Sequence, residues 1–389
     1  MYIAQLLVTK HNNKKNLYKS LLMKNVKFLA MLAFVAAGLF TTTSCSDSDN
    51  DDPTGGAVVN VYDYVLVVKS NVAATVTFNG KTQTGTEVTF ATSENVNSYS
   101  GSLSVTANGY LPYNADVNFS ENNTVKIVNV TMVKESTNTV AQDAAKGNTV
   151  ANDAANQAAM GTVAQIEVPS DVNISGNTTD PFSVTVVNPD ADVVGADELE
   201  KGEEVSAAVM ELLCKPNGAQ FDKALTLSIA LADGNGCEFT SDEAEQVYWQ
   251  NGRLYAKAKH FSTIEAEMVV EVVDVKESTV TREISQQAKA GENSFKYAHQ
   301  TGFTSNVVAD GAKYLFLKNK FGAPGSINRE ATFTIDKNGY VVIRLVQKVY
   351  DYTFKSGTAT FTARVYGDID AAIVRTSTEP INIHSGGSN

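Results

Sequence analysis

Short runs in which apolar and polar residues alternate make up most of the chain after residue 56. A period of two residues puts alternate side chains on opposite faces of a strand, so these runs predict β-strands with one buried and one wet face. Asn-Gly pairs stand between several runs, at Asn79-Gly80, Asn251-Gly252 and Asn338-Gly339. Both residue types adopt positive φ readily, and we expect each pair to close a β-hairpin. Long helical periodicities are scarce, so the pattern predicts an all-β protein made of β-sandwich-like modules.

Breaks in the alternation divide this part of the chain into three tandem modules, residues 57–134, 166–275 and 276–389. We expect the last six residues, HSGGSN, to form a frayed tail. The predicted strands are 64–69, 74–78, 88–90, 101–107, 114–119 and 125–133; then 166–168, 182–187, 207–213, 225–231, 247–249, 254–258 and 262–270; and finally 314–317, 331–335, 340–346, 350–354 and 358–366, with a short helix predicted at 283–290.

Residues 135–165 interrupt the strand pattern. NTVAQDAA at 138–145 recurs as NTVANDAA at 148–155, and Val140 and Val150 are its sizeable apolar side chains. So little apolar area does not offset the entropy of ordering the segment. We therefore expect a linker that is at most partly helical.

Two of the modules resemble known β-sandwich families. ATVTFNGK at 74–81 and GSLSVTANGYLPYNADV at 101–117 resemble the PEGA and carboxypeptidase-regulatory-like sandwiches, which implies a spacer or a binding platform without catalytic residues. KPNGAQFDKALTLSIAL at 215–231 and VYWQNGRLYAKAKHFSTIEAE at 247–267 are similar to the ZU-type domain of ankyrins and netrin receptors. The residues that match the ZU-type pattern are Pro216, Gly218, Phe221, Ala224, Trp249, His260, Phe261 and Ser262.

The N-terminal region reads as an export signal. Lys24 and Lys27 precede an apolar run at 28–40, which is short of the roughly 20 residues that a membrane-spanning helix needs and fits a cleaved signal peptide. Cys45 follows, and then SDSDNDD. This segment resembles the Asp-rich export signal after the lipidated cysteine of surface lipoproteins of the Bacteroidetes, which implies a fatty-acyl anchor such as palmitate on Cys45. We expect residues 1–44 to be a mis-assigned start plus the signal peptide, with translation beginning at Met1 or Met23, and residues 45–56 to be an acidic tether.

Charge limits the classes of partner. Residues 1–44 carry six lysines and no acidic residue, so the mature chain has 25 basic and 43 acidic residues and a net charge near −18. Nucleic acid and anionic lipid headgroups require a concentrated basic patch, and this composition argues against both. The expected membrane attachment is the lipid at Cys45. A glycan or a protein remains open as the ligand.

Cys214 and Cys237 remain once Cys45 carries lipid. In an oxidising envelope compartment, an even pair suggests a disulfide. The alternative is two buried free thiols. No Cys-x-x-Cys or His pair stands at metal-ligand spacing, and no cofactor motif is present.

His260-Phe261-Ser262 is the most specific candidate catalytic motif in the sequence. In some ZU-type and related autoproteolytic domains a His-Phe-Ser cleaves itself, with the serine hydroxyl attacking the preceding carbonyl. The alternative is that Phe261 is a core residue and that its neighbours His260 and Ser262 face outward. The strand here has no Gly or Pro to strain it, which favours that alternative.

Two further groups of residues carry weaker candidate sites. Asp190, Asp192, Asp197 and Glu198 could offer oxygen ligands to calcium, but they lack the EF-hand order, so a solvated acidic loop is the simpler interpretation. Tyr350, Tyr352 and Phe354 alternate on one strand face and could stack on a sugar, but such a face is more often core, as is Trp249.

These patterns together predict a non-enzymatic lipoprotein at the outer membrane, facing the cell exterior, with a binding, adhesion or accessory role. The alternatives are a self-cleaving module at Phe261-Ser262 and a structural spacer. The binding interpretation predicts acidic or aromatic clusters at the ends of a sandwich, and the spacer predicts none.

Overall fold

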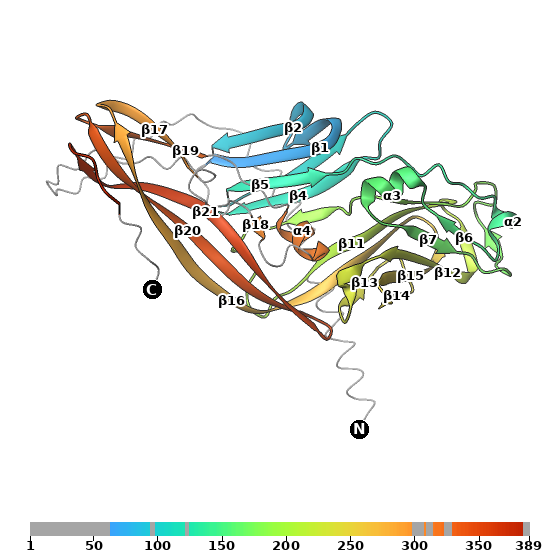
Figure 1. Ribbon diagram of the computed structural model, residues 1–389. Coiled ribbons are helices and arrows are strands. Elements are labelled where there is room, and N and C mark those ends of the chain that lie inside the picture. The colour runs from blue at the N-terminus through green and yellow to red at the C-terminus, as the bar shows by residue number, and fades with distance from the viewer. Residues whose placement is uncertain are drawn as a thin grey trace, which may run out of the picture. The chain divides into compact units, whose positions relative to one another are not determined.

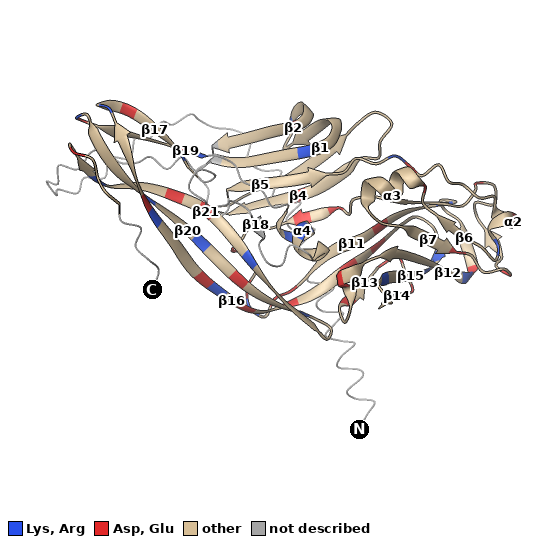
Figure 2. Cartoon of the chain, viewed as in Figure 1, with Lys and Arg blue, Asp and Glu red and all other residues tan. Residues whose placement is uncertain are grey.

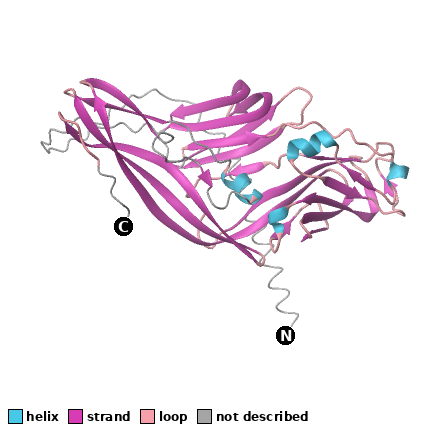
Figure 3. Cartoon of the chain, viewed as in Figure 1, coloured by secondary structure: helices cyan, strands magenta, loops and turns pink. Residues whose placement is uncertain are grey.

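The computed structural model describes residues 63–93, 98–120, 124–297, 307–308, 314–322 and 329–383. The chain divides into two compact units, residues 1–53 and 54–389, and every described residue belongs to the second. Strands dominate and helices are few, so the predicted all-β class is confirmed (Figure 3). The predicted signal peptide, Cys45, the acidic tether and the C-terminal tail lie outside the described residues. No helix in the described ranges is long and apolar enough to span a membrane.

The first sheet is organised around β1 (Asp63–Phe78), whose register shifts between Lys69 and Ala74. The first half of β1 pairs in parallel with β5, and the second half pairs antiparallel with β3. Phe78 pairs with Lys81, and Asn79 and Gly80 have φ of 46° and 78°, so the predicted two-residue hairpin is confirmed. The other strands are β2 (Lys81–Ser93), β3 (Ser98–Thr106), β4 (Tyr113–Ser120) and β5 (Val125–Val130), in the order β10-β4-β3-β1-β2 with β5 beside β1.

Residues 135–165 pack against a second hydrophobic core, which lies between the next two sheets of the chain. The prediction that they form a linker is wrong. Ala145 and Val150 are buried in that core, and the Asn156 side chain exchanges two hydrogen bonds of 3.0 Å with the backbone of Val186. Asparagine amides thus supply partners for a neighbouring strand, which the count of apolar area could not anticipate. The elements here are α2 (Gln142–Ala145), β6 (Thr149–Ala151) and α3 (Ala154–Met160), which Asp153 caps.

Two further sheets enclose this second core. One has the order β14-β15-β12-β7-β6, and the other runs β18-β21-β20-β16-β11-β9. Gln250 pairs with Arg253 across Asn251 and Gly252, whose φ values of 50° and 78° confirm the second predicted hairpin. The strands are β7 (Ala164–Glu167), β8 (Ile174–Ser175), β9 (Ser183–Val186), β10 (Ala191–Val193), β11 (Glu204–Lys215), β12 (Gln220–Ala230), β13 (Glu238–Thr240), β14 (Gln246–Gln250) and β15 (Arg253–His260), with the short helix η1 (Ala232–Gly234).

The third predicted module shares its sheet with the second. β16 (Thr263–Ala288) runs through the boundary expected between 275 and 276, pairing first with β11 and then with β20 (Figure 1). The predicted helix at 283–290 is therefore wrong, because most of it is the end of β16. The remaining elements are β17 (Gly291–Tyr297), β18 (Val307–Val308), α4 (Leu315–Phe321), β19 (Arg329–Ile335), β20 (Gly339–Ser356) and β21 (Ala359–Ser377).

Two more local predictions in this region are wrong. The strand expected at 314–317 is the start of α4, in which Phe316, Leu317, Lys320 and Phe321 are buried at helical spacing. Asn338-Gly339 does not close a hairpin, because β19 pairs with β17 while β20 pairs with β16 and β21. A Cβ on Gly339 would overlap the carbonyl oxygen of Ser377. Glycine is needed here for a close backbone approach.

Acidic and basic residues are interspersed along β16 and β20 (Figure 2). Cross-strand ion pairs join them, including Lys348 to Glu277 at 3.3 Å between side chains that are about half exposed. Exposed pairs of this kind contribute little to stability. The ion pairs lie on the solvent-exposed face of the long strands. On the opposite face, Val341, Ile343 and Leu345 are buried against β17 and β19.

A buried polar cluster ties the first sheet to the long strands. Arg329 on β19 forms an ion pair with Asp368 in β21, and the side chains are 10% and 8% exposed. The Thr124 hydroxyl, just before β5, donates to the same Asp368 carboxylate. Buried pairs of this type are sensitive to the loss of either partner.

Candidate functional site

A short strand from the middle of the chain completes the first sheet. β10 pairs in parallel with β4, placing Ala191 opposite Ala115 and Val193 opposite Val117. Asp190 and Asp192, the weak calcium candidates of the sequence, flank and occupy this strand. They therefore lie where the first sheet meets β11.

Hydrogen bonds hold β10 in place from both sides. The Asn114 backbone N–H donates to Asp190 Oδ1 at 3.3 Å, and the Asn118 side chain donates to Asp192 Oδ1 at 2.8 Å. From the other side, the Asp190 backbone N–H donates to Glu211 Oε2 at 3.0 Å. Lys320 on α4 lies 3.8 Å from Asp192.

Lys126 on β5 is fully buried behind this strand. Its ammonium donates to the carbonyl of Val194, directly after β10. Burial lowers the pKa of Lys126, and the nearby carboxylates of Glu198, Asp197 and Asp192 oppose that shift. The same burial raises the pKa of Glu198. The sequence predicted that this acidic loop would be solvated. Its carboxylates instead lie close to a buried lysine.

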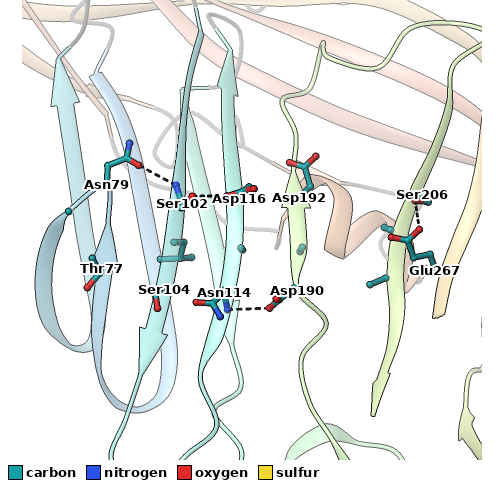
Figure 4. A pocket seen from close by; sticks show the side chains of 16 residues that line it. Thr77, Asn79, Ser102, Ser104, Asn114, Asp116, Asp190, Asp192, Ser206 and Glu267 are labelled. Atoms are coloured by element: carbon teal, nitrogen blue, oxygen red, sulfur yellow. Dashed lines mark hydrogen bonds between the residues drawn. The ribbon is translucent and has the colours of Figure 1, made fainter. Parts of the chain in front are cut away.

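An open pocket of about 600 Å³ is lined by residues of the neighbouring strands β1, β3, β4 and β10 and by residues of β11 and β16 (Figure 4). We call it the junction pocket. Amide, hydroxyl and carboxylate groups line it, and none of the sixteen described residues around it is a lysine, an arginine, a histidine or an aromatic residue. Its labelled polar residues are Thr77, Asn79, Ser102, Ser104, Asn114, Asp116, Asp190, Asp192, Ser206 and Glu267.

Two carboxylates of the junction pocket are oriented by serines. Ser102 donates to Asp116 at 2.8 Å, and Ser206 donates to Glu267 at 2.7 Å (Figure 4). Asp116, Asp190 and Glu267 form no ion pair with any residue the structure describes. Three carboxylates therefore face one pocket without a compensating cation.

Mutual repulsion and burial perturb the acidic groups around β10. Burial raises the pKa of Asp190, and the charge of Asp116 adds to the increase. Burial also raises the pKa of Glu211 to about 7, with smaller contributions from the charges of Asp190 and Glu265. A cation bound in the junction pocket would relieve this repulsion.

The described carboxylates of the junction pocket are not grouped as metal ligands. Within the described ranges no group of three or more His, Cys, Asp or Glu side chains is placed to hold a metal ion. Asp192 is already engaged by Asn118 and lies near Lys320. The carboxylate, amide and hydroxyl oxygens that line the pocket can accept hydrogen bonds.

His260-Phe261-Ser262 lies at the corner where β15 leads into β16, in a different part of the fold. Phe261 is 2% exposed and packs against Phe182 and Phe221 at ring-centroid distances of 5.7 and 4.8 Å. His260 is exposed, and Ser262 Oγ donates to the Thr263 carbonyl at 3.1 Å. This geometry agrees with a core phenylalanine between two outward-facing neighbours.

The predicted disulfide is absent, and both Cys214 and Cys237 are free thiols. The Cys214 backbone bonds to Ser262, whereas Glu238, next to Cys237, is opposite Val269. Seven residues of one extended segment separate these points, roughly 20 Å at the usual rise per residue. A disulfide needs Cα atoms about 4.4–6.8 Å apart, so sequence spacing alone was misleading.

The aromatic candidates divide into two groups. Tyr350, Tyr352 and Phe354 are 4%, 1% and 0% exposed, which confirms that they belong to the core. Trp249 is half-buried on the edge strand β14, where it packs against the core and also lines a second pocket. Sequence reasoning missed that pocket, as it missed Asp116 and Glu267 in the junction pocket and Glu211 beside it.

No protein-family model and no curated protein matches this chain. A solved structure from Bacteroides fragilis NCTC 9343, provisionally described as a membrane-associated protein of unknown function, is similar with 12% sequence identity and a TM-score of 0.19. The alignment covers 81% of this chain and 98% of the other. A likeness at this level carries no argument about function. The resemblances to the PEGA, carboxypeptidase-regulatory-like and ZU-type families stay predictions.

Proposed function

We propose that this chain is a non-enzymatic envelope lipoprotein that binds a cationic, hydrogen-bonding ligand in the junction pocket. The observation that carries the proposal is the set of Asp116, Asp190 and Glu267 carboxylates, which face the pocket without ion-pair partners among the described residues. Lysine and arginine side chains of a polypeptide have the matching charge and donors. A basic protein segment is therefore the proposed ligand.

The polar lining supports this ligand class. An ammonium group offers three donors and no acceptor, and a guanidinium offers five. The free oxygen atoms of three carboxylates can accept them, while Asn79 and Asn114 contribute amide groups nearby. An anionic ligand would meet like charge, and a large apolar ligand would find no aromatic surface among the described lining residues.

The proposed location rests on the sequence. A signal peptide ending at Cys45 and the SDSDNDD tether support a lipid anchor at the outer membrane with the folded part facing the exterior. A strongly acidic surface also increases the rate at which cationic partners associate. The pocket then determines which of them stay bound.

The test is binding of a fluorescein-labelled hexalysine peptide to the full chain in detergent, followed by fluorescence polarisation. We expect the affinity to fall steeply as salt rises, because the attraction is between exposed charges. The double variant Asp116→Asn, Glu267→Gln should bind about tenfold more weakly, about 1.4 kcal/mol. Both amides still accept the serine hydrogen bonds, so the fold should be kept.

The matched control is Glu292→Gln with Asp242→Asn, which makes the same charge change at two exposed sites outside the pocket. The control should bind the peptide as the wild type does. Equal losses in both double variants would mean that net charge alone attracts the peptide, and the proposal would fail. No binding by the wild type would favour the spacer.

A further inference from the structure

The second pocket, of about 620 Å³, lies where three loop ends meet. The residues come from the segment after η1, from β14 and its turn, and from the turn between β20 and β21. Its volume is in the range of small-molecule sites. We call it the Trp249 pocket, because it contains the single tryptophan of the chain.

The indole of Trp249 is held rigidly. Its Nε1 donates to the carbonyl of Leu231 at 2.7 Å, so the polar edge of the ring is already bonded. A Cβ on Gly234 would overlap Cδ1 of the indole, so the backbone there passes directly against the ring. The ring is nevertheless only half-buried, and it lines the pocket. What it offers a ligand is aromatic surface.

Uncharged polar groups surround this surface. Asn235 and Asn251 line the pocket, and their side-chain amides have no hydrogen-bond partner among the described residues. Each amide can both donate and accept, which suits a hydroxyl group. Glu238 is the one charged residue of the described lining, so the pocket has no cation to attract an anionic ligand.

The loops that form the pocket are bonded to one another. The Thr358 backbone N–H donates to the Gly236 carbonyl at 2.8 Å, and the Glu238 backbone N–H donates to Ser356 Oγ at 2.8 Å. These bonds join the segment after η1 to the β20–β21 turn. A site that is formed before binding loses less entropy when it takes a ligand.

We propose that the Trp249 pocket binds a neutral pyranose unit of a saccharide. The C–H groups of a sugar ring are slightly positive and pack on the negative face of an indole. The hydroxyls at the ring edge then bond to Asn235 and Asn251, which accept and donate as each hydroxyl requires. This site is separate from the junction pocket and does not depend on a cationic ligand there.

The test uses tryptophan fluorescence, which reports this pocket alone because the chain has one tryptophan. The full chain in a non-glycosidic detergent is titrated with neutral hexasaccharides of mannose, glucose, xylose and N-acetylglucosamine. We expect at least one to change the emission in a saturable way. Asn235→Ala should weaken binding of that saccharide roughly two- to tenfold, the effect of one hydrogen bond.

Gln246→Ala is the matched control, since it also removes an exposed side-chain amide, on the strand that carries Trp249 but outside the pocket. It should bind the saccharide as the wild type does. Trp249→Phe keeps an aromatic ring of smaller area and should weaken binding in affinity electrophoresis.

Three results would overturn the proposal. One is no saturable change with any saccharide at millimolar concentration. Another is equal binding by the wild type and the Asn235→Ala variant. The third is a saturable change with tetramethylammonium but not with saccharides, which would make the pocket a site for organic cations.

Discussion

Glu211 on β11 accepts a hydrogen bond from the backbone N–H of Asp190, with 3.0 Å between Oε2 and N. This bond joins β11 to the residue that precedes β10. It also places two carboxyl groups close together in a partly buried site, and the pKa of both is raised. The junction pocket is consequently coupled to pH through a group that does not line it.

We predict that Glu211 makes folding stability depend on pH below neutrality. The pKa of Glu211 is about 7 in the folded state against 4.5 for the free side chain, so between these values the folded protein binds the extra proton. Its contribution to stability is fully present below pH 4.5 and is lost as the pH rises through about 7. Urea unfolding at a series of pH values measures it.

In the Glu211→Gln variant the free energy of unfolding should depend less on pH. Its slope in that window should be smaller by up to about 1.4 kcal/mol per pH unit. Lys126 titrates in both proteins and cancels in the comparison. Glu292→Gln, on the exposed strand β17, should follow the wild type. Identical slopes for Glu211→Gln and wild type would show that Glu211 has an ordinary pKa.

A second prediction concerns the buried pair of Arg329 and Asp368. Asp368→Asn leaves the guanidinium without its counter-ion in a site where the side chain is 10% exposed, so we expect a loss of about 3–5 kcal/mol in the free energy of unfolding. Asp351→Asn breaks the exposed pair with Arg364 and should cost less than about 1 kcal/mol. If the two variants lose the same amount, the pair is not buried as described.

The third prediction concerns the thiols. In the Cys45→Ala variant, both remaining cysteines should react with a thiol reagent after unfolding, without prior reduction. In the folded protein Cys237 should react first, since it is half-buried, and Cys214 should react only on unfolding, because it is fully buried and burial raises its pKa. Absence of any thiol before reduction would restore the disulfide.

Local sequence signals predicted many of the strands but not all of their partners. Asn79-Gly80 and Asn251-Gly252 each close a hairpin, because both positions need positive φ and the flanking strands pair with each other. Asn338-Gly339 carries the same dipeptide, yet its flanking strands pair elsewhere. An Asn-Gly pair indicates the backbone conformation of two residues. It does not indicate which strand the following strand pairs with.

The candidate site could be predicted only in part, for a related reason. Asp190 and Asp192 stand out in the sequence as an acidic loop, but a strand of three residues has no period to recognise. Its parallel partner β4 precedes it by more than seventy residues, and Glu267 follows later still. Lys126 looks like a surface lysine, and nothing local indicates that it is buried.

The fourth prediction concerns the anchor, which rests on the sequence. Cys45→Ala should move the protein from the membrane fraction to the soluble fraction or leave it unprocessed, because the acyl acceptor is lost. Replacing Asp47, Asp49, Asp51 and Asp52 with alanine should reduce the access of added protease to the protein on intact cells. Wild-type protein without lipid after metabolic labelling would refute the anchor, and unchanged protease access would refute the export role of the tether.

The last prediction concerns the bond between Phe261 and Ser262, which we expect to stay intact. Phe261 is bonded on both sides, since its N–H donates to the Ala219 carbonyl at 3.0 Å and its carbonyl accepts from the Gly218 N–H at 2.9 Å. Ser262 Oγ donates a hydrogen bond to the Thr263 carbonyl, which engages the hydroxyl that would have to act as the nucleophile. Among the described non-glycine residues, positive φ occurs at Asn79 and Asn251, so the corner stores no strain of that kind.

Purified protein should therefore run as one chain on a denaturing gel after long incubation, and Ser262→Ala should change nothing. His260→Ala should be equally silent, because the imidazole is exposed at the end of β15 and orients no nucleophile. Two fragments that meet at Ser262, formed by the wild type and abolished by Ser262→Ala, would make self-cleavage the leading function. The relaxed backbone and the buried ring at 261 argue for the opposite outcome, a corner whose purpose is to lead the chain from one sheet of the sandwich into the other.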